Sequence, residues 1–563
     1  MGSITEKPWF RKFLISLVGK PRLKEFDAIS HRLKATQDSL LKKIVKTSKD
    51  TVFGKEHGFH TIQTIDDFRK AVPISGFGRH RPYVERMCKG EADVLFPGRP
   101  LFYNTTSGTT SRPKLIPVSR DYFENAYSGL NKLWLYTCLK DNPHIYDGKS
   151  LSAVSPAEEG TVEDGTPYGA ISGMAFKNIP NVLKSTYSCP YSVICIKDYI
   201  KKYYTMMRFA LEADITIIIA ASPASVLRLY EIGIECSSDL IKDIRDGTLR
   251  KDVVDTITPP DREDILSRLK PNKARAQELE RFINTYGEDL RPKHYWPNIA
   301  LVNTWKQGNF ARIIPKLDGL FPEATVIRAF GYQASEGRAG LVLGNDWDYS
   351  VCAAHIYHFE FIEEEARQQI DPPVLQAHEV EVGKRYYIIF SNGSGLYRYD
   401  INDIVQITGF YNQIPCFRFI QKGEGITSLT GEKLSEEQVM QAIAEVTEEK
   451  SIGVEFYTMF CDENDLCYKL FVEFKPGVEN AQKEKFPILV DEKLRKLNPE
   501  YEVKRGTKRL DAPLFYEFVN NAYEQLKETL VAAGISRAGQ YKEVYLTRKV
   551  EMLQYLEGLV KKE

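Results

Sequence analysis

The side chains best suited to chemistry gather in one polar segment, residues 103–119, which reads Y-N-T-T-S-G-T-T-S-R-P-K-L-I-P-V-S. Its hydroxyl residues surround Gly108 and precede Lys114: Thr105, Thr106, Ser107, Thr109, Thr110 and Ser111. Such a segment offers a phosphate hydroxyl donors, a cation and backbone N–H groups, because glycine permits a left-handed turn. It is not the P-loop of NTPases, whose Gly-x4-Gly-Lys-Ser/Thr pattern occurs nowhere in the chain. Taken alone, the segment also fits a solvated turn.

Two further motifs follow the hydroxyl-rich segment. Residues 332–336 read Y-Q-A-S-E, and residues 397–403 read Y-R-Y-D-I-N-D. Together with residues 106–114 (T-S-G-T-T-S-R-P-K), they resemble, in order and with similar gaps, the three motifs of the Gretchen Hagen (auxin-responsive) family of acyl acid–amido synthetases. That family is a branch of the acyl-adenylating enzymes, and the resemblance covers nearly the whole chain.

The resemblance implies that this chain activates a carboxylic acid with ATP. A free carboxylate is a poor electrophile, so the acid attacks the α-phosphate and forms an acyl-adenylate and pyrophosphate. Catalysis then consists of holding phosphates, spreading negative charge and positioning two anions that repel each other. The phosphate-binding residues would be Thr106, Ser107, Gly108, Thr109 and Thr110.

The second and third motifs would supply the rest of the nucleotide site. Glu336 would act in catalysis and bind Mg²⁺, which usually binds through one or two carboxylates and phosphate oxygens. Tyr332 would stack on adenine and Ser335 would contact the nucleotide. Asp403 would accept hydrogen bonds from the ribose hydroxyls, a task that suits a carboxylate.

Lys542 is the expected mobile cation. It ends the sequence Gly-Gln-Tyr-Lys, which resembles the family's C-terminal Gln-Tyr/Phe-Lys segment. The resemblance implies that a small lobe brings Lys542 beside the α-phosphate and the acyl carboxylate. Without the resemblance, Lys542 fits a solvated loop lysine. Arg398 equally fits a structural brace, and Lys422 fits a hinge residue.

The chain departs from the family pattern at two positions. Plant members tend to have Gly before the final Asp of the third motif and a second Ser before the Ser-Glu pair. Asn402 and Ala334 stand at these positions here. Neither change removes a charge, so we expect adenylation to persist with an altered nucleotide affinity.

Length and composition fit a soluble globular protein with more than one domain. A chain of 563 residues is too long for one core. Lys+Arg and Asp+Glu both number 76, which gives no electrostatic reason to expect nucleic acid or an anionic membrane as a partner. The nine cysteines include no C-x-x-C, and the longest apolar run, residues 215–221, is far shorter than the ~20 residues of a membrane span. We expect a cytoplasmic protein whose partners are a small carboxylic acid and an amino acid.

The residue pattern predicts an α/β fold with a large N-terminal lobe. Amphipathic helices are expected within residues 9–66 and at 121–139. Strands at 215–221, 300–303 and 325–329 alternate with helices such as 224–232, which favours a parallel sheet with its ligand at the carboxyl ends of the strands. The glycine-rich residues 162–180 correspond to part of the family's acyl pocket, and they fit an irregular surface loop equally well.

The residue pattern changes after Asn345, from strands that alternate with helices to a series of strands. Strands at 355–362, 385–390 and 404–407 predict an antiparallel, barrel-like subdomain of about residues 346–420. His355 and His358 lie three apart, which on a strand places them on opposite faces, so we expect two structural histidines rather than a metal site.

A smaller α+β lobe is expected to complete the chain. Residues 1–422 would bind the acid and ATP, and residues 423–563 would form a mobile lid joined through a glycine-rich hinge at 421–434. The lid is predicted to contain a hairpin (454–460 with 468–474), a helix at 480–497, a strand near 501–504 and an amphipathic helix from 515 to 530 that ends at Gly534.

Three functions remain open at the level of sequence. The first is a ligase that forms carbon–nitrogen bonds by aminolysis of the acyl-adenylate. The second uses the same adenylate with coenzyme A as the acceptor. The third is a non-catalytic nucleotide-binding protein, which the joint presence of Glu336, Asp403 and Lys542 argues against.

Overall fold

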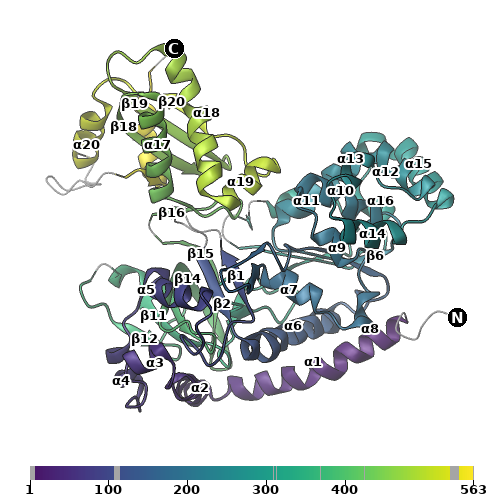
Figure 1. Ribbon diagram of the computed structural model, residues 1–563, viewed down its shortest axis with the longest axis horizontal. Helices are drawn as coiled ribbons and strands as arrows, with labels where there is room; N and C mark the ends of the chain where they lie inside the picture. Colours follow the sequence, from purple (N-terminus) through teal and green to yellow (C-terminus); the bar gives the residue numbers. More distant parts are fainter. Residues whose placement is uncertain are drawn as a thin grey trace. The chain divides into compact units, whose positions relative to one another are not determined.

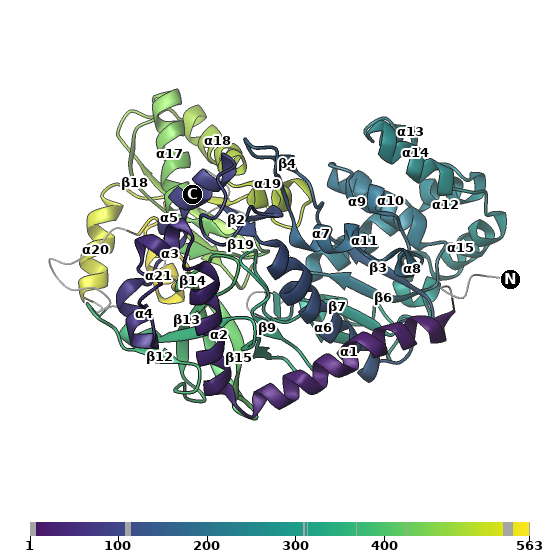
Figure 2. The ribbon, with the colours of Figure 1, turned by 60° about the horizontal axis from the view of Figure 1, so that its bottom comes forward.

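The structure, a computed structural model, describes residues 7–106, 114–307, 310–311, 313–367, 369–423, 425–532 and 544–561. The chain forms two compact units. Unit 1 holds residues 7–106 and 115–421, and unit 2 begins at Lys422 (Figures 1 and 2). Each unit is described by itself below.

Helices open unit 1. They are α1 (Pro8–Ser30), α2 (Leu33–Ser48), α3 (Val52–Glu56), α4 (Ile65–Ala71) and α5 (Phe77–Cys88). Those within residues 9–66 confirm the predicted helices, whereas α5 lies outside the predicted range. Helix α6 (Ser128–Asp141) continues directly from a π-helical turn, η2 (Tyr122–Tyr127), and confirms the helix predicted at 121–139. Both views show α1 running alongside α6 (Figures 1 and 2). A Cβ at Gly19 would lie 2.1 Å from the Cβ of Tyr136, so this close helix contact requires glycine.

A four-stranded parallel sheet forms the middle of unit 1. Its strands are β3 (Lys149–Ala153), β6 (Ile215–Ala220), β7 (Leu301–Thr304) and β8 (Val326–Ala329), in the order β3-β6-β7-β8. Neighbouring residues of one strand pack into opposite cores: Ile217 lies with Trp134 of α6, and Ile218 lies with Met206 of α10 (Tyr199–Ala210). Because both faces are covered, the central strand β6 (I-T-I-I-I-A) is almost continuously apolar. The predicted parallel α/β arrangement is confirmed.

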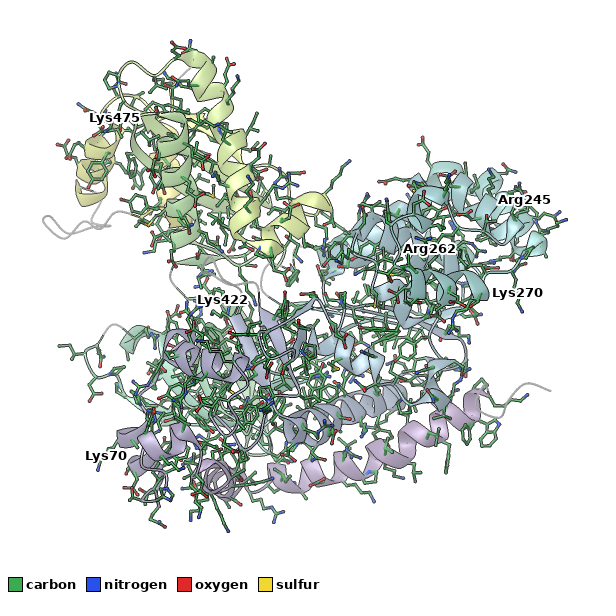
Figure 3. All side chains as sticks on the ribbon, viewed as in Figure 1. Lys70, Arg245, Arg262, Lys270, Lys422 and Lys475 are labelled. Carbon is green, nitrogen blue, oxygen red and sulfur yellow. The ribbon has the colours of Figure 1, made fainter. Side chains whose placement is uncertain are left out.

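The helices on the second face of this sheet form a layer that is polar on its outside. They are α10, α11 (Pro223–Glu235), α12 (Ser237–Asp246), α13 (Lys251–Val254), α14 (Pro259–Arg268), α15 (Lys273–Tyr286) and α16 (Pro292–Tyr295). Three charged residues of this layer, Arg245, Arg262 and Lys270, are labelled in Figure 3. Shorter helices connect it to the sheet: α7 (Ile171–Lys177), α8 (Asn181–Lys184) and α9 (Tyr191–Ile194).

A small sheet carries the start of the hydroxyl-rich segment. It contains β1 (Phe102–Thr106), β2 (Lys114–Val118), β4 (Gly160–Thr161) and β5 (Pro167–Gly169), in the order β2-β1-β5-β4. Strand β1 pairs in parallel with β5, with Asn104 opposite Gly169. Residues 167–177 are therefore a strand and a helix, so the alternative of an irregular surface loop is wrong for this stretch.

The residues after 340 form an antiparallel sheet of seven strands. They are β9 (Gly340–Leu341), β10 (Ser350–Cys352), β11 (His358–Glu363), β12 (Val374–Gln376), β13 (Arg385–Ser391), β14 (Tyr399–Tyr411) and β15 (Ile414–Lys422). The order is β12-β11-β13-β14-β15-β10-β9, and within the described residues β12 and β9 are its two ends. The predicted antiparallel arrangement of these strands is confirmed, but their closure into a barrel is not.

Unit 2 is an α+β fold. Its main sheet has the order β20-β19-β18-β21, with β18 (Val454–Asp462), β19 (Cys467–Phe474), β20 (Leu514–Glu517) and β21 (Leu546–Thr547). The remaining elements are β16 (Ile426–Thr427), β17 (Leu434–Ser435), α17 (Glu436–Lys450), α18 (Asn480–Leu497), α19 (Pro499–Gly506), α20 (Ala522–Ala532) and α21 (Val550–Gly558). The antiparallel β18–β19 hairpin and helix α18 confirm two predictions.

Two predictions in unit 2 are wrong. The strand expected near residues 501–504 is helix α19, because the side chain of Asn498 caps it by accepting from the Tyr501 N–H and Pro499 starts its first turn. The helix expected from residue 515 starts instead at Ala522. The residues before it form β20, in which Phe515 pairs with Leu470 of β19. Gly534, its expected end, lies outside the described residues.

None of the helices in the described ranges combines the length and the apolar composition that crossing a bilayer requires.

Candidate functional site

The second motif begins just beyond the carboxyl end of β8. Gly331 has φ +97°, and a Cβ there would lie 2.7 Å from the Gly340 carbonyl oxygen, so the turn into the motif requires glycine. The Tyr332 N–H donates to Ser350 Oγ (3.0 Å), and the Gly340 N–H donates to the Tyr332 carbonyl (3.0 Å). These bonds fix the motif on the seven-stranded sheet.

A tight turn then sets the direction of Glu336. Ala334 and Gly337 exchange two backbone hydrogen bonds of 2.9 and 3.2 Å. Gly337 has φ +153°, and a Cβ on it would lie 2.1 Å from the Tyr357 hydroxyl. The Glu336 side chain is left 7% exposed, which makes it a largely desolvated carboxylate.

The second and third motifs are joined by two tyrosine–carboxylate hydrogen bonds. The Tyr332 hydroxyl donates to Asp403 Oδ2 (2.5 Å), and the Tyr399 hydroxyl donates to Glu336 Oε1 (3.1 Å). Asp403 is also buried, at 3% exposure. Burial raises the pKa of both tyrosines well above the usual value, and the two carboxylates raise it further. The phenols therefore stay protonated and act as fixed donors to the carboxylates.

Asn104 links the hydroxyl-rich segment to this pair of motifs. Its side-chain amide donates to the Ser335 carbonyl (2.6 Å) and accepts from the Ile171 N–H at the start of α7 (2.8 Å). Ser335 Oγ in turn donates to the Thr105 carbonyl (2.8 Å). Asn104 is 3% exposed, so these bonds lie in a dry environment. One buried side chain thus connects β1, the second motif and the helix of the glycine-rich segment.

Two residues of the third motif, Asn402 and Arg398, have a left-handed backbone conformation. Asn402 has φ +59°, a left-handed conformation that asparagine tolerates better than most residues, so it replaces the family's glycine without blocking the turn. Arg398, at φ +45°, donates to both oxygens of Glu360 (2.8 and 3.1 Å) and to the carbonyls of Arg69 and Val72. The alternative that Arg398 is a structural brace is confirmed.

The ring of Tyr332 lies inside the protein. It is 1% exposed and packs on Phe417, with ring centroids 5.3 Å apart, and on Trp305 and Phe419 at 6.3 Å each. Stacking on adenine requires an exposed ring face, so that role stays a prediction that needs a rearrangement of this cluster. The observed role of Tyr332 is to hold Asp403.

The structure thus brings together Tyr332, Ser335, Glu336 and Asp403 beside the end of β1. Thr106 is described only as the last residue of that strand. The remaining candidates lie outside the described residues: Ser107, Gly108, Thr109, Thr110 and Lys542. Their roles in binding phosphate and in catalysis stay predictions.

Sequence reasoning missed Asn104, the phenol of Tyr399 and His80. His80, on α5, accepts the Tyr397 N–H at Nε2 (3.3 Å), while its Nδ1 lies 3.4 Å from the Gly76 carbonyl. These contacts fit one neutral tautomer, with the proton on Nδ1. Burial lowers the pKa of His80 to about 4. Asn104 and Tyr399 lie inside or beside recognised motifs, whereas nothing in the local pattern around His80 signals its contact with residue 397.

The neutral state of His80 predicts acid sensitivity. The pKa of His80 is near 4 in the folded protein and 6.5 as the ordinary value, so the folded state binds fewer protons between these limits. The stability it contributes is complete above pH 6.5 and is lost as the pH falls toward 4, on the order of 3 kcal/mol in total. The urea midpoint should therefore fall less between pH 7 and pH 4.5 in His80→Gln than in the parent. His60→Gln, at an exposed position, should follow the parent, and equal losses in all three proteins would contradict the prediction.

Replacement of Asn104 should loosen the site. Asn104→Asp keeps an acceptor for the Ile171 N–H but places a carboxylate oxygen against the Ser335 carbonyl. Leaving a buried carbonyl unsatisfied costs about 1–3 kcal/mol, so we expect kcat/KM for ATP to fall by about 10–100-fold. Steady-state kinetics of pyrophosphate release measures this. Asn480→Asp makes the same change in charge at an exposed helix start and should leave kcat/KM unchanged. If Asn104→Asp had the kinetics of the parent, the hydrogen bonds of Asn104 would not support the use of ATP and the prediction would be wrong.

Comparisons with known proteins agree along the whole chain. Residues 22–326 match the GH3 family N-terminal domain, residues 350–422 the GH3 family central domain and residues 437–551 the GH3 family C-terminal domain. A 4-substituted benzoates-glutamate ligase of Arabidopsis thaliana is 24% identical over 568 residues, which cover 95% of this chain and 97% of that protein. A jasmonoyl–L-amino acid synthetase of Oryza sativa subsp. japonica is 25% identical, with 78% and 80% covered.

The fold is similar to that of a solved protein as well. The GH3.15 acyl acid amido synthetase superimposes with a TM-score of 0.64 at 22% identity, and the match covers 96% of both chains. The N-terminal family model alone spans more than half of the chain, from residue 22 to residue 326. This chain therefore belongs to the GH3 family, the Gretchen Hagen family that its three motifs resemble.

Proposed function

We propose that this chain is an ATP-dependent acyl acid–amido synthetase, a ligase that forms carbon–nitrogen bonds. It activates a carboxylic acid as the acyl-adenylate, releases pyrophosphate, and transfers the acyl group to the amine of an amino acid. The observation that carries the proposal is the pairing of Tyr332 with Asp403 and of Tyr399 with Glu336. These bonds join the second and third motifs and hold two buried carboxylates, which supports a common site. Family membership and the names of the relatives support it further.

The carboxylates have chemically distinct tasks. Asp403 accepts hydrogen bonds from the ribose hydroxyls of ATP, which is a substrate of the reaction. Glu336 would hold Mg²⁺, and a single buried carboxylate suits that ion because Mg²⁺ in proteins usually takes its other ligands from phosphate oxygens and water. Bound Mg²⁺ would neutralise phosphate charge. Among the described residues no group of three or more His, Cys, Asp or Glu side chains could form an all-protein metal site, and a phosphate-dependent site needs none.

The two half-reactions follow from the chemistry of the acid. A carboxylate oxygen attacks the α-phosphorus, the bond from that phosphorus to the bridging oxygen breaks, and pyrophosphate leaves. The amine nitrogen then attacks the acyl carbon, the bond between the acyl carbon and the phosphate oxygen breaks, and AMP leaves while the nitrogen loses its proton. The chain's part is to orient the reactants, since Tyr332 and Tyr399 hold the carboxylates and Asn104 holds the Ser335 backbone.

The roles of the two domains extend this proposal. Residues 1–422 bind the acid and ATP, and residues 423–563 act as a lid that carries Lys542 to the reacting phosphate. Thr106, Ser107, Gly108, Thr109 and Thr110 hold the outer phosphates. The glycine-rich residues 421–434 absorb the backbone change, for which Gly425 (φ +74°) and Gly431 (φ +104°) already occupy the left-handed region. We place the enzyme in the cytoplasm.

One assay tests the activity. The protein is incubated with ATP, Mg²⁺ and substituted benzoates, indole-3-acetic acid, jasmonic acid or aliphatic acids, and pyrophosphate exchange is measured. Amino acids or coenzyme A are then added and the product is identified by mass. We expect acid-dependent exchange and an amide product. Exchange with no acid of the panel would favour the non-catalytic nucleotide-binding protein, and a thioester product would favour the coenzyme A ligase.

A charge-matched pair of variants ties the activity to the site. Glu336→Gln removes the carboxylate charge at the proposed metal position and should lower the exchange rate by about 10²-fold or more. Glu492→Gln makes the same change on an exposed face of α18 and should leave the rate unchanged. Equal rates in both variants would remove Glu336 from the mechanism.

A further inference from the structure

Unit 1 contains a groove that shares no lining residue with the site described above. The groove has a volume of about 760 Å³ and lies between α1, α2, η2 with α6, and the loop before β11. Figure 2 shows α1 and α6 side by side, with α2 following α1. Its apolar residues are Phe26, Ile29, Leu40, Leu130, Leu133 and Ile356. Sites for small molecules commonly have volumes of about 300–1,000 Å³ and mostly apolar linings.

The charged residues of this groove are mainly cations. Arg22, Arg32 and Lys43 line it, and Glu25 is the single carboxylate among the lining residues. Lys132 of α6 adds a further cation near Arg22. Burial lowers the pKa of Lys132, and the nearby charge of Arg22 lowers it further. No ion pair of these four cations occurs within the described ranges, although the protein as a whole carries equal numbers of both signs. Three cations against one carboxylate give the lining of the groove a net positive charge, which attracts an anion.

His355 gives a second, independent indication of a ligand. Its side chain lines the groove and packs edge-to-face on Phe26, with ring centroids 5.4 Å apart. Its Nδ1 atom is buried and has no hydrogen-bond partner among the residues that the structure describes. Buried polar atoms are nearly always hydrogen-bonded, so this unpaired nitrogen leaves an unmet hydrogen bond in the wall of the groove.

We propose that this groove binds a small amphiphilic carboxylate, a molecule with one anionic head and an apolar body. Arg22, Arg32 and Lys43 take the head, and the floor of Phe26, Leu40 and neighbouring residues takes the body. The ligand therefore shares its chemical class with the acid substrate of the proposed reaction, but none of the three motifs reaches this groove. The molecule is bound here without being activated, which makes the groove a second, non-catalytic site.

Binding by charge gives the first test. Octanoate is titrated into the full-length protein by calorimetry, with octyltrimethylammonium as a probe of opposite charge and benzoate as an acid without an aliphatic tail. We expect octanoate to bind and the cation not to bind. Benzoate binding as tightly as octanoate would assign the groove to the aromatic acid class, whereas weaker benzoate binding would assign it to aliphatic acids. Equal binding of anion and cation would overturn the proposal.

Variants locate the octanoate site. The Arg32→Glu/Lys43→Glu double variant should weaken octanoate binding by at least about tenfold, because it reverses the charge around the head group. Lys42→Glu/Lys46→Glu makes the same change at exposed positions on α2 outside the groove, and it should bind as the parent does. Unchanged affinity in the groove variant would overturn the proposal.

Two controls separate this result from misfolding and from the catalytic site. Ala35→Trp narrows the groove from an exposed helical position, keeps every cation and should also block octanoate. Urea midpoints check that each variant folds. Pyrophosphate exchange is measured with an acid substrate from the activity assay and without octanoate. Its rate should be the same in the parent and in the groove variants, since no motif residue is changed. A groove variant that folds but loses exchange together with octanoate binding would show that the groove is not independent of the catalytic site, and this would overturn the proposal. Displacement by an acidic amphipathic peptide, but not by acids, would identify a protein partner.

Discussion

Lys542→Ala should slow acyl-adenylate formation by about 10²–10³-fold and leave the affinity for ATP within about a few-fold. The reason is that a cation brought beside the α-phosphate stabilises charge that develops only in the transition state. A group of this kind raises the rate of the chemical step, while ground-state binding depends on the phosphate contacts of other residues. Single-turnover pyrophosphate release measures the rate, and equilibrium binding of ATP measures the affinity.

Three comparisons sharpen this experiment. Lys542→Arg keeps the charge but changes its geometry, so it should recover part of the rate. Lys549→Ala removes an exposed lysine just before α21 and should behave as the parent. A Lys542→Ala enzyme as fast as the parent would show that another cation acts at the phosphate. A loss of ATP affinity as large as the loss of rate would show that Lys542 contributes to binding and not to the transition state.

The parts of the fold that sequence reasoning predicted correctly have a strong local cause. The β-branched run in β6 followed by a Pro-started helix could form only a buried strand and its crossover helix. The amphipathic spacing in α2 likewise specified a helix. These signals are repeated along each element, so the competing structure would bury polar residues. The parallel sheet and the helical start of unit 1 therefore follow from composition and periodicity.

The errors occur where distant residues decide the structure. Before α20, Phe515, Phe518 and Val519 have the i, i+3, i+4 spacing of a helix face, which is the basis of the predicted helix. Pairing with β19 selects the strand. The segment of α19 contains apolar residues typical of a strand, but the Asn498 cap and Pro499 start a helix there. Whether seven antiparallel strands close into a barrel depends on contacts between the first and last of them, which local patterns do not encode.

The candidate site shows the same division. Motif spacing identified Tyr332, Glu336 and Asp403, because the chemistry of each residue type is visible in the sequence. The partner of each residue was not predictable: the Tyr332 phenol holds Asp403, and the Tyr399 phenol holds Glu336. The bonded residues lie 71 and 63 positions apart in the sequence, so only the tertiary fold brings them together.

Glu360→Met should destabilise the protein by about 3–5 kcal/mol, because it leaves the Arg398 guanidinium buried without its counter-charge. Glu360 and Arg398 are 1% and 4% exposed, and two hydrogen bonds of 2.8 and 3.1 Å join them. Burial alone would raise the pKa of Glu360, but the charge and hydrogen bonds of Arg398 hold it below its usual value. The stability from this carboxylate is therefore present above its unfolded-state pKa and is lost as the pH falls through the lower folded-state value. Urea unfolding at pH 7 measures the loss.

The double variant Glu360→Met/Arg398→Met distinguishes a stranded charge from lost packing. With both charges removed, most of the stability should return, because apolar side chains of similar volume often replace a buried ion pair with little loss. The recovery should be incomplete for two reasons. The Arg69 guanidinium loses its 2.8 Å ion pair with Glu360, and the carbonyls of Arg69 and Val72 lose the donor that Arg398 supplies. Asp38→Asn breaks the exposed Lys34–Asp38 pair at 3.0 Å and should cost less than about 1 kcal/mol. If the double variant were as unstable as Glu360→Met alone, the loss would come from packing around residue 360 and not from the buried arginine.

Because residue 398 directly precedes Tyr399, the same variants should lower acid-dependent exchange in proportion to how far they displace the phenol that holds Glu336.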